Sequence, residues 1–436
     1  MQKTLTYRII FILLGPLVCL LMNLVEVTFI SPEADKVISV AAWMVIWWIS
    51  EPVSISVTAL LPIAVFPLMG IMPVREATAY YGSSIIFLFL GGFLLALAME
   101  KVNLHKRIAL KILLITGTGE RGVLLGFILA TALLSMWISN TATTLVILPI
   151  ALSIISFLSE RTETAFDESG VGNFKVACML GIAYAANIGG TATIIGTPPN
   201  VVLIGYMEEN LNREMDFLAW MVIALPFALI MLTATYFLLV RLFKIAPVSD
   251  LSPRAVIQQE LDALGKLSRD EISVLIAFSI TILLWVFRLQ INRLTGLTLS
   301  NTGIAISGAL LVFIIPSQRG SHAVLQWQDT QKMQWGILIL FGGGLALANG
   351  FSRAGIMQLI GDFVKEEGCQ AATVTPFITA VMLFMTEMMR NVAMVNQFVT
   401  MISGEVEGLG VVVLEMRNSV ALASSCASML PLSPRP

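Results

Sequence analysis

The sequence is poor in charged residues and almost free of histidine. Only 12% of its 436 residues are Asp, Glu, Lys or Arg, two are histidine, and 57% are hydrophobic. Long apolar runs and so little charge exclude an ordinary soluble core, and nothing indicates a nucleic-acid partner. We therefore predict an all-α polytopic membrane protein, because helices satisfy their own backbone hydrogen bonds in lipid.

Cysteine and the groups that catalysis requires are also scarce. The four cysteines stand singly, with no CxxC spacing, which favours buried thiols over metal ligands or disulfides. No Lys, Arg, Asp or Glu lies between Arg121 and Glu160, and the first half has no Ser/His/Asp set or paired carboxylates at membrane depth. These absences argue against an enzyme.

Four apolar runs open the chain, at residues 9–30, 37–49, 53–69 and 83–99. The first follows Lys3 and Arg8 and is longer than the hydrophobic region of a signal peptide. We expect an uncleaved first span in the cell membrane, with a cytoplasmic N-terminus. The basic stretch after the fourth run is also cytoplasmic by the positive-inside rule, so the two criteria agree.

Residues 123–159 are too long for one span and too short for two full spans with a loop. Their middle holds Ser139-Asn140-Thr141. Two arms of roughly 16 to 18 residues, rising about 1.5 Å per residue, reach deep into a hydrocarbon core of about 30 Å and return. We predict a re-entrant helical hairpin with this tripeptide at its tip.

Residues 176–206 are predicted to be a crossing helix that is broken in its middle. The residues of the break are Gly189, Gly190, Thr197, Pro198, Pro199 and Asn200. Glycines weaken a helix, and prolines remove hydrogen-bond donors and clash with the preceding turn. Irregular backbone at membrane depth is tolerated where it lines a polar cavity. The break therefore indicates such a cavity.

The rest of the chain repeats this plan. Further spans are expected at residues 217–243, 272–287, 299–315 and 335–351, a cytoplasmic linker at 244–271, a second hairpin at 371–403 and a final span from 411 to 430. Leu90-Gly91-Gly92 resembles Phe341-Gly342-Gly343, 251 positions later, and the same shift takes Asn140 to Asn391. This pattern predicts an inverted repeat with two hairpin tips that converge near the midplane.

Converging helix ends and unwound backbone would bind ions of both signs. Helix N-termini offer free N–H groups and partial positive charge, which suit carboxylate or sulfate oxygens. Unwound carbonyls, the Ser139 hydroxyl and the Asn140 amide oxygen suit a small hard cation such as sodium. A site with so few fixed charges needs the cation in order to hold a divalent anion.

Four stretches resemble a known family. They are SMWISNTAT (135–143), NIGGTATIIGTPPN (187–200), FGGGLALANGFSRAG (341–355) and LASSCASMLP (422–431). They are similar to the divalent anion/sodium symporters, which carry di- and tricarboxylates or sulfate. The resemblance implies secondary active transport by a homodimer, sodium coupling, no organic cofactor, and a transport domain that moves against a scaffold like an elevator.

The resemblance also assigns residues. It implies a sodium ion held by Ser135, Ser139, Asn140 and the backbone at Gly190, and an anion that faces Asn140, Thr141, Thr191 and Asn391. It divides the chain into N-terminal scaffold spans (1–82), a first transport repeat (83–210), scaffold spans with the cytoplasmic linker (211–334) and a second transport repeat (335–436).

The second repeat departs from the family pattern. Where a second Ser-Asn-Thr is expected, the sequence has Arg390-Asn391-Val392, without either hydroxyl. After Pro431 a second proline-broken loop and a last span are expected, so we interpret this repeat as truncated. Two alternatives to sodium symport follow: a sodium-independent anion exchanger with Arg390 as a fixed positive charge, or a family member that does not transport.

Overall fold

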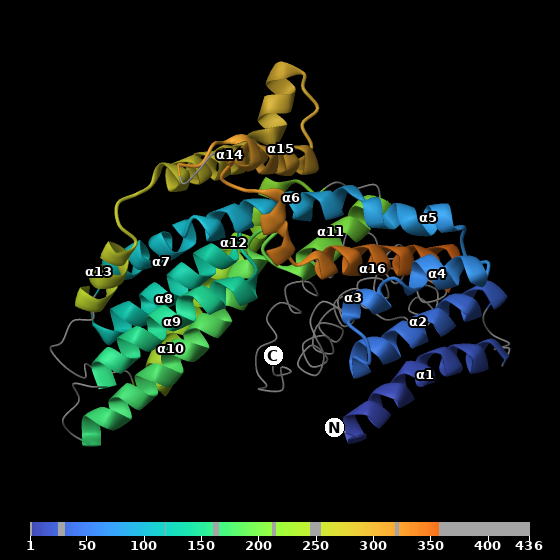
Figure 1. The fold of residues 1–436 in the computed structure, drawn as a ribbon, viewed down its shortest axis with the longest axis horizontal. Coiled ribbons are helices and arrows are strands. Elements are labelled where there is room, and N and C mark those ends of the chain that lie inside the picture. Colours follow the sequence, from blue (N-terminus) through green and yellow to red (C-terminus); the bar gives the residue numbers. More distant parts are fainter. Residues whose placement is uncertain are drawn as a thin grey trace, which may run out of the picture. The chain divides into compact units, whose positions relative to one another are not determined.

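The computed structural model describes residues 2–24, 31–117, 119–159, 165–211, 215–244, 254–318 and 322–356. Over these ranges the chain is helical, with one isolated bridge between Pro316 and Ala323 and no strand (Figure 1). Seven helical segments in these ranges have the length and composition to cross a membrane: Leu5–Leu24, Val74–Lys101, Asn140–Ser159, Gly170–Thr191, Phe217–Leu242, Arg269–Thr295 and Trp335–Arg353. The all-α polytopic prediction is confirmed.

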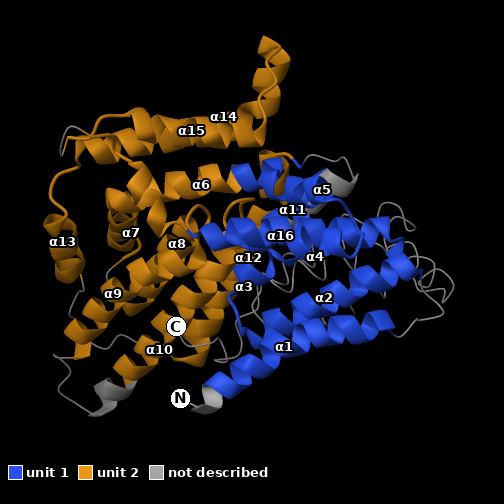
Figure 2. Ribbon diagram, turned by 45° about the vertical axis from the view of Figure 1, so that its right-hand side comes forward, with its two compact units in different colours: residues 1–87, 198–215, 334–436 blue, residues 88–197, 216–333 orange. Residues whose placement is uncertain are grey.

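The described residues form two compact units (Figure 2). The first takes its described residues from 1–87, 198–215 and 334–436, and the second consists of those within 88–197 and 216–333. Each unit is therefore assembled from segments far apart in the sequence. The division into scaffold and transport segments stays a prediction, and the second hairpin, the final span, Arg390, Asn391 and Pro431 lie outside the described residues.

The first unit begins with helices α1 (Gln2–Leu24) and α2 (Pro32–Ser50), which lie side by side (Figure 1). Ser31 fixes the start of α2, because its hydroxyl accepts a hydrogen bond from the Ala34 N–H at 3.2 Å. Pro32 is favourable at the first helical position, where no N–H is needed. The remaining helices of this unit are α3 (Ile55–Thr58), α4 (Leu61–Leu68), α5 (Val74–Ala79), the 3₁₀ turn η1 (Tyr80–Gly82), α11 (Pro198–Leu211) and α16 (Trp335–Arg353).

The third predicted span, residues 53–69, is not one helix. The chain forms α3 and α4 with a break at Ala59 and Leu60. Pro62 explains the break, because its ring would clash with the carbonyl of Thr58 and it has no N–H to continue the ladder. The apolar run at 53–69 is therefore interrupted near its middle, and its crossing of the membrane stays a prediction.

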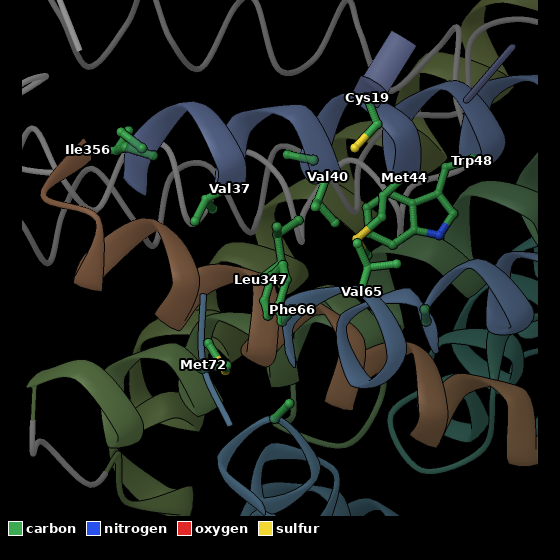
Figure 3. Packing of buried hydrophobic residues seen from close by; sticks show 14 of the residues in the cluster. Cys19, Val37, Val40, Met44, Trp48, Val65, Phe66, Met72, Leu347 and Ile356 are labelled. Carbon is green, nitrogen blue, oxygen red and sulfur yellow. The ribbon is translucent and has the colours of Figure 1, made fainter. Parts of the chain in front are cut away.

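The core of the first unit joins α2, α4 and α16. Val37, Val40 and Met44 lie on one face of α2 at helical spacing and are almost fully buried. Phe66 from α4 and Leu347 from α16 extend into the same cluster (Figure 3). This packing fixes the position of α16, which contains the second copy of the repeated Gly-Gly motif, Gly342-Gly343.

The second unit contains the first predicted hairpin. Its helices are the greater part of α6 (Ser84–Lys101), α7 (Leu104–Ile115), α8 (Glu120–Ser135), α9 (Asn140–Ser159), α10 (Ala165–Thr191), α12 (Phe217–Leu242), α13 (Arg254–Ala263), α14 (Arg269–Thr295), α15 (Asn301–Ile314) and the 3₁₀ helix η2 (Trp327–Lys332). Helices α8, α9 and α10 pack against one another (Figure 1). The described residues of the predicted linker, 244–271, include the short helix α13 and the first three residues of α14.

Helix α10 continues through the glycines at which we expected it to break. It ends at Thr191, so the irregular segment comprises residues 192–197 and begins two residues after Gly190. A methyl group on Gly189 would collide with the backbone of Ala132 in α8. Gly189 therefore allows α10 and α8 to approach closely, and its role is in helix packing and not in ending the helix.

Candidate functional site

The polar tripeptide lies where two helices meet. Helix α8 ends at Ser135, a four-residue turn follows, and α9 begins at Asn140. Ser139 caps α9, because its hydroxyl accepts a hydrogen bond from the Ala142 N–H at 3.3 Å. The tripeptide is thus at the turn between two helices, as predicted, whereas the re-entrant course of these helices in a membrane stays a prediction.

Three oxygen atoms meet beside this turn. The Ser135 hydroxyl lies 2.7 Å from Asn140 Oδ1 and 2.7 Å from the carbonyl oxygen of Ala186 in α10. The Asn140 amide nitrogen donates to Asn187 Oδ1 at 3.1 Å. A methyl group on Gly190 would lie 2.6 Å from Asn140 Oδ1, so a glycine is needed for this approach.

The chemistry of this oxygen cluster (Ser135 Oγ, Asn140 Oδ1 and the Ala186 carbonyl) indicates what it can bind. Ser135 has a single hydroxyl proton and lies within hydrogen-bond distance of both other oxygens. Hydroxyl, amide and carbonyl oxygens are hard ligands, so the cluster suits a small hard cation. Ser135, Asn140 and Gly190, three of the residues expected around sodium, are brought together here.

The residues expected to face the anion differ in their surroundings. Thr141 lies in the first turn of α9 with an exposed side chain. Thr191 is fully buried, its hydroxyl donates to the Ile188 carbonyl at 2.7 Å, and its own carbonyl accepts from Trp220 Nε1 at 3.1 Å. The N-terminus of α9 carries partial positive charge, which favours an anion. Thr141 is thus the exposed one of the two threonines.

The segment after α10 folds back onto the same site. The Thr193 hydroxyl donates to the Met136 carbonyl in the α8–α9 turn. Gly196 packs against the Gly190 carbonyl so closely that a methyl group would clash with it. These two contacts join residues 192–197 to the α8–α9 turn and to Gly190 beside the oxygen cluster.

The proline pair at the end of the break starts the next helix. Pro198 and Pro199 are the first residues of α11, where a missing N–H is harmless. Thr197, which precedes them, is buried in the second unit, and Asn200 is buried in the first. The prolines, which we expected to lie within the break, thus begin the helix that follows it.

Aromatic residues around the turn were missed by the sequence analysis. Trp137 lies within the turn, between Ser135 and Asn140, and its ring contacts Phe217 and Phe278. The one sequence signal was a tryptophan inside the SMWISNTAT motif, and its partners come from two distant helices, α12 and α14.

The profile of the family described as "Sodium:sulfate symporter transmembrane region" matches residues 2–436. The chain belongs to this family. This symporter-family protein is 35% identical over 439 residues to the sodium-dependent dicarboxylate transporter SdcS of Staphylococcus saprophyticus, with 98% of this chain and 84% of the relative covered. The transporters of the same name from Staphylococcus aureus strains RF122 and MRSA252 are each 36% identical, over 444 and 446 residues, with 84% of each relative covered.

These matches confirm the family resemblance found in the sequence. They also confirm that the protein is a multi-pass membrane transporter of a symporter family and not an enzyme.

Proposed function

We propose that this symporter-family protein is a secondary transporter that moves dicarboxylates together with sodium. The oxygen cluster at the α8–α9 turn is the observation that supports the proposal most directly, because a hydroxyl, an amide and a carbonyl oxygen converge there. The relatives named above are sodium-dependent dicarboxylate transporters, which favours C4 dicarboxylates such as succinate or malate over citrate or sulfate.

The coupling follows from charge. A sodium ion at Ser135, Ser139, Asn140 and the Gly190 backbone adds one positive charge to a turn whose flanking helix α9 contains no charged residue. Asn140, Thr141 and Thr191 from the first half and Asn391 from the second would then face the carboxylates. Without the cation, only the partial positive charge at the helix N-terminus attracts the divalent anion, and binding is weak.

The proposal includes the architecture expected of such a transporter. The protein would be a homodimer in the cell membrane with a cytoplasmic N-terminus. Hairpin 123–159 would pair with hairpin 371–403 as an inverted repeat, and the transport segments would move against the scaffold by an elevator-type motion. The helix–turn–helix at α8 and α9 and the interruption after α10 support this course of the chain.

The test is succinate uptake by the purified protein in proteoliposomes. We expect accumulation of radiolabelled succinate that rises steeply with an inward sodium gradient, compared with potassium at the same ionic strength. Malate, citrate and sulfate as unlabelled competitors then rank the anions.

A matched pair of variants connects uptake to the site. Ser135→Ala removes a hydroxyl from the oxygen cluster, whereas Ser153→Ala removes an exposed hydroxyl of α9 that bonds only within its helix, to the Pro149 carbonyl. We expect the first to weaken sodium dependence and the second to leave it unchanged. Uptake that ignores sodium but needs a counter-anion would support the exchanger with Arg390, and absence of uptake with every anion would support the non-transporting alternative.

A further inference from the structure

The first turn of α12 contacts both the α8–α9 turn and the last residue of α10. Phe217 and Trp220 lie one helical turn apart and are almost fully buried. The Phe217 ring stacks on Trp137 of the α8–α9 turn, with centroids 6.2 Å apart and an interplanar angle of 18°. The Trp220 indole N–H donates to the carbonyl of Thr191, where α10 ends, at 3.1 Å. One turn of helix thus contacts the hairpin turn and the end of α10.

Side chains of helix α14 hold the first turn of α12 in place. Trp285 stacks on Phe217, with centroids 4.7 Å apart and an interplanar angle of 11°. One turn further along α14, Arg288 Nε donates to Asp216 Oδ1 at 3.0 Å, and the two side chains are only 7% and 12% exposed. Asp216 also caps α12 by accepting the Leu218 N–H at 3.2 Å. The start of α12 is therefore held by a stack and by a buried ion pair.

The stack continues to the residue beside the oxygen cluster. Trp137 lies between Ser135 and Asn140 in the sequence, and its ring also meets Phe278 of α14 edge-on at 5.2 Å. Aromatic pairs stabilise a contact beyond the burial of their area, so the three ring contacts among Trp137, Phe217, Phe278 and Trp285 hold the α8–α9 turn in place. Ser135 and Asn140 are separated by only this turn, so a shift of the turn changes the distances among the three oxygens.

We propose that Phe217 and Trp220, the first turn of α12, position the oxygen cluster for the cation. They are positioning residues, since neither contributes an oxygen ligand. The inference rests on the proposed sodium coupling and extends it to residues outside the family motif. Residues behind the ligands of a metal typically change its affinity by about 10 to 100-fold when they are replaced.

The test compares two phenylalanines of one helix. Phe217→Leu removes the stack on Trp137, whereas Phe237→Leu makes the same chemical change at a side chain of α12 that is 64% exposed. In proteoliposomes we expect Phe217→Leu to raise the sodium concentration for half-maximal succinate uptake several-fold, up to about tenfold, which is the lower end of the range for groups that orient metal ligands. The rate at saturating sodium should stay near the wild-type rate, and Phe237→Leu should leave both quantities unchanged.

Trp220→Phe is the second variant, because it keeps the ring and removes only the N–H that binds Thr191. Trp327→Phe, at an exposed tryptophan of η2, is its control. Trp220→Phe should also raise the half-maximal sodium concentration, by a smaller factor. If Phe217→Leu does not fold, Trp220→Phe alone tests whether the first turn of α12 positions the oxygen cluster.

Two other results would overturn the inference, and they are distinguishable. If wild-type uptake depends on sodium but the variants lose maximal rate at an unchanged half-maximal sodium concentration, the aromatic residues serve stability alone and only the positioning role fails. If wild-type uptake and thermal stability show no dependence on sodium, the proposed function fails, and the positioning role fails with it.

Discussion

The buried ion pair between Arg107 of α7 and Glu271 of α14 gives the sharpest test of the described fold. Arg107 Nε lies 2.6 Å from Glu271 Oε1, and the two side chains are 7% and 5% exposed. The guanidinium also donates to Glu271 Oε2 and to the carbonyls of Leu264 and Gly265. Each of the three guanidinium nitrogens thus donates a hydrogen bond within the protein. The pair fixes the end of the predicted linker against α7.

The perturbation is Arg107→Met, which keeps much of the apolar stem and removes the charge. It leaves the Glu271 carboxylate without its cation and two carbonyls without their donors. Removal of one partner from a buried, hydrogen-bonded pair costs about 3–5 kcal/mol of the free energy of unfolding. The retained hydrogen bond of Glu271 from the Ser268 N–H, at 2.7 Å, places the expected loss at the lower end, about 3 kcal/mol.

The neighbouring pair Lys106–Glu260 is the matched control. It joins α7 to α13 at 2.8 Å, but its side chains are 31% and 34% exposed. Lys106→Met is therefore expected to cost less than about 1 kcal/mol. In the double variant Arg107→Met/Glu271→Gln, no buried charge is left unpaired, so at least half of the lost stability should return.

The assay is reversible unfolding in mixed micelles, with increasing dodecyl sulfate and helicity followed by circular dichroism. Equal losses for Arg107→Met and Lys106→Met would refute the buried pair. So would a double variant as unstable as Arg107→Met, because the loss would then have a cause other than the orphaned carboxylate.

Three further predictions concern the site and its surroundings. Ser135→Ala should raise the sodium concentration for half-maximal uptake several-fold at an unchanged amount of folded protein, measured by transport in proteoliposomes; an unchanged value would contradict the oxygen cluster as the cation site. Gly189→Ala should cost about 1–3 kcal/mol of unfolding free energy because its methyl group meets α8, whereas Gly172→Ala, with open space around it, should be neutral or stabilising, and equal effects would argue against the close helix contact. Burial alone would raise the pKa of Asp329, but hydrogen bonds from Lys101 and the Gln326 N–H and the charges of Lys101 and Lys332 outweigh it and hold this pKa below its ordinary value. The stability contributed by Asp329 is thus present above about pH 4 and is lost as the pH falls through the lowered pKa, so thermal stability between pH 3 and 7 should fall less in Asp329→Asn than in the wild type, and parallel curves would contradict the ion pair.

Patterns in the sequence predicted the features of the fold that depend on local chemistry. Apolar runs of span length predict helices, since lipid leaves backbone groups no other partner. The polar tripeptide predicted the turn between α8 and α9. Each of these features is encoded within a few consecutive residues.

Other features were misjudged because one residue type has several uses. Gly189 and Gly190 suggested a helix break, but Gly189 serves the contact with Ala132 and Gly190 makes room for Asn140. Pro62 was visible in the sequence, yet the apolar run around it concealed the break between α3 and α4. The structural role of a glycine or a proline can be assigned only when its neighbours in space are known.

The sequence by itself determined the family, the helical membrane class and the polar residues at the centre of the candidate site. Those follow from composition and from short motifs, in which the residues that act together are close in the chain. Only the tertiary structure decided which oxygens meet around Ser135, and that Phe217 and Trp285 stack behind Trp137. These contacts join α8, α10, α12 and α14, and no local pattern encodes them, because they depend on how separate helices pack.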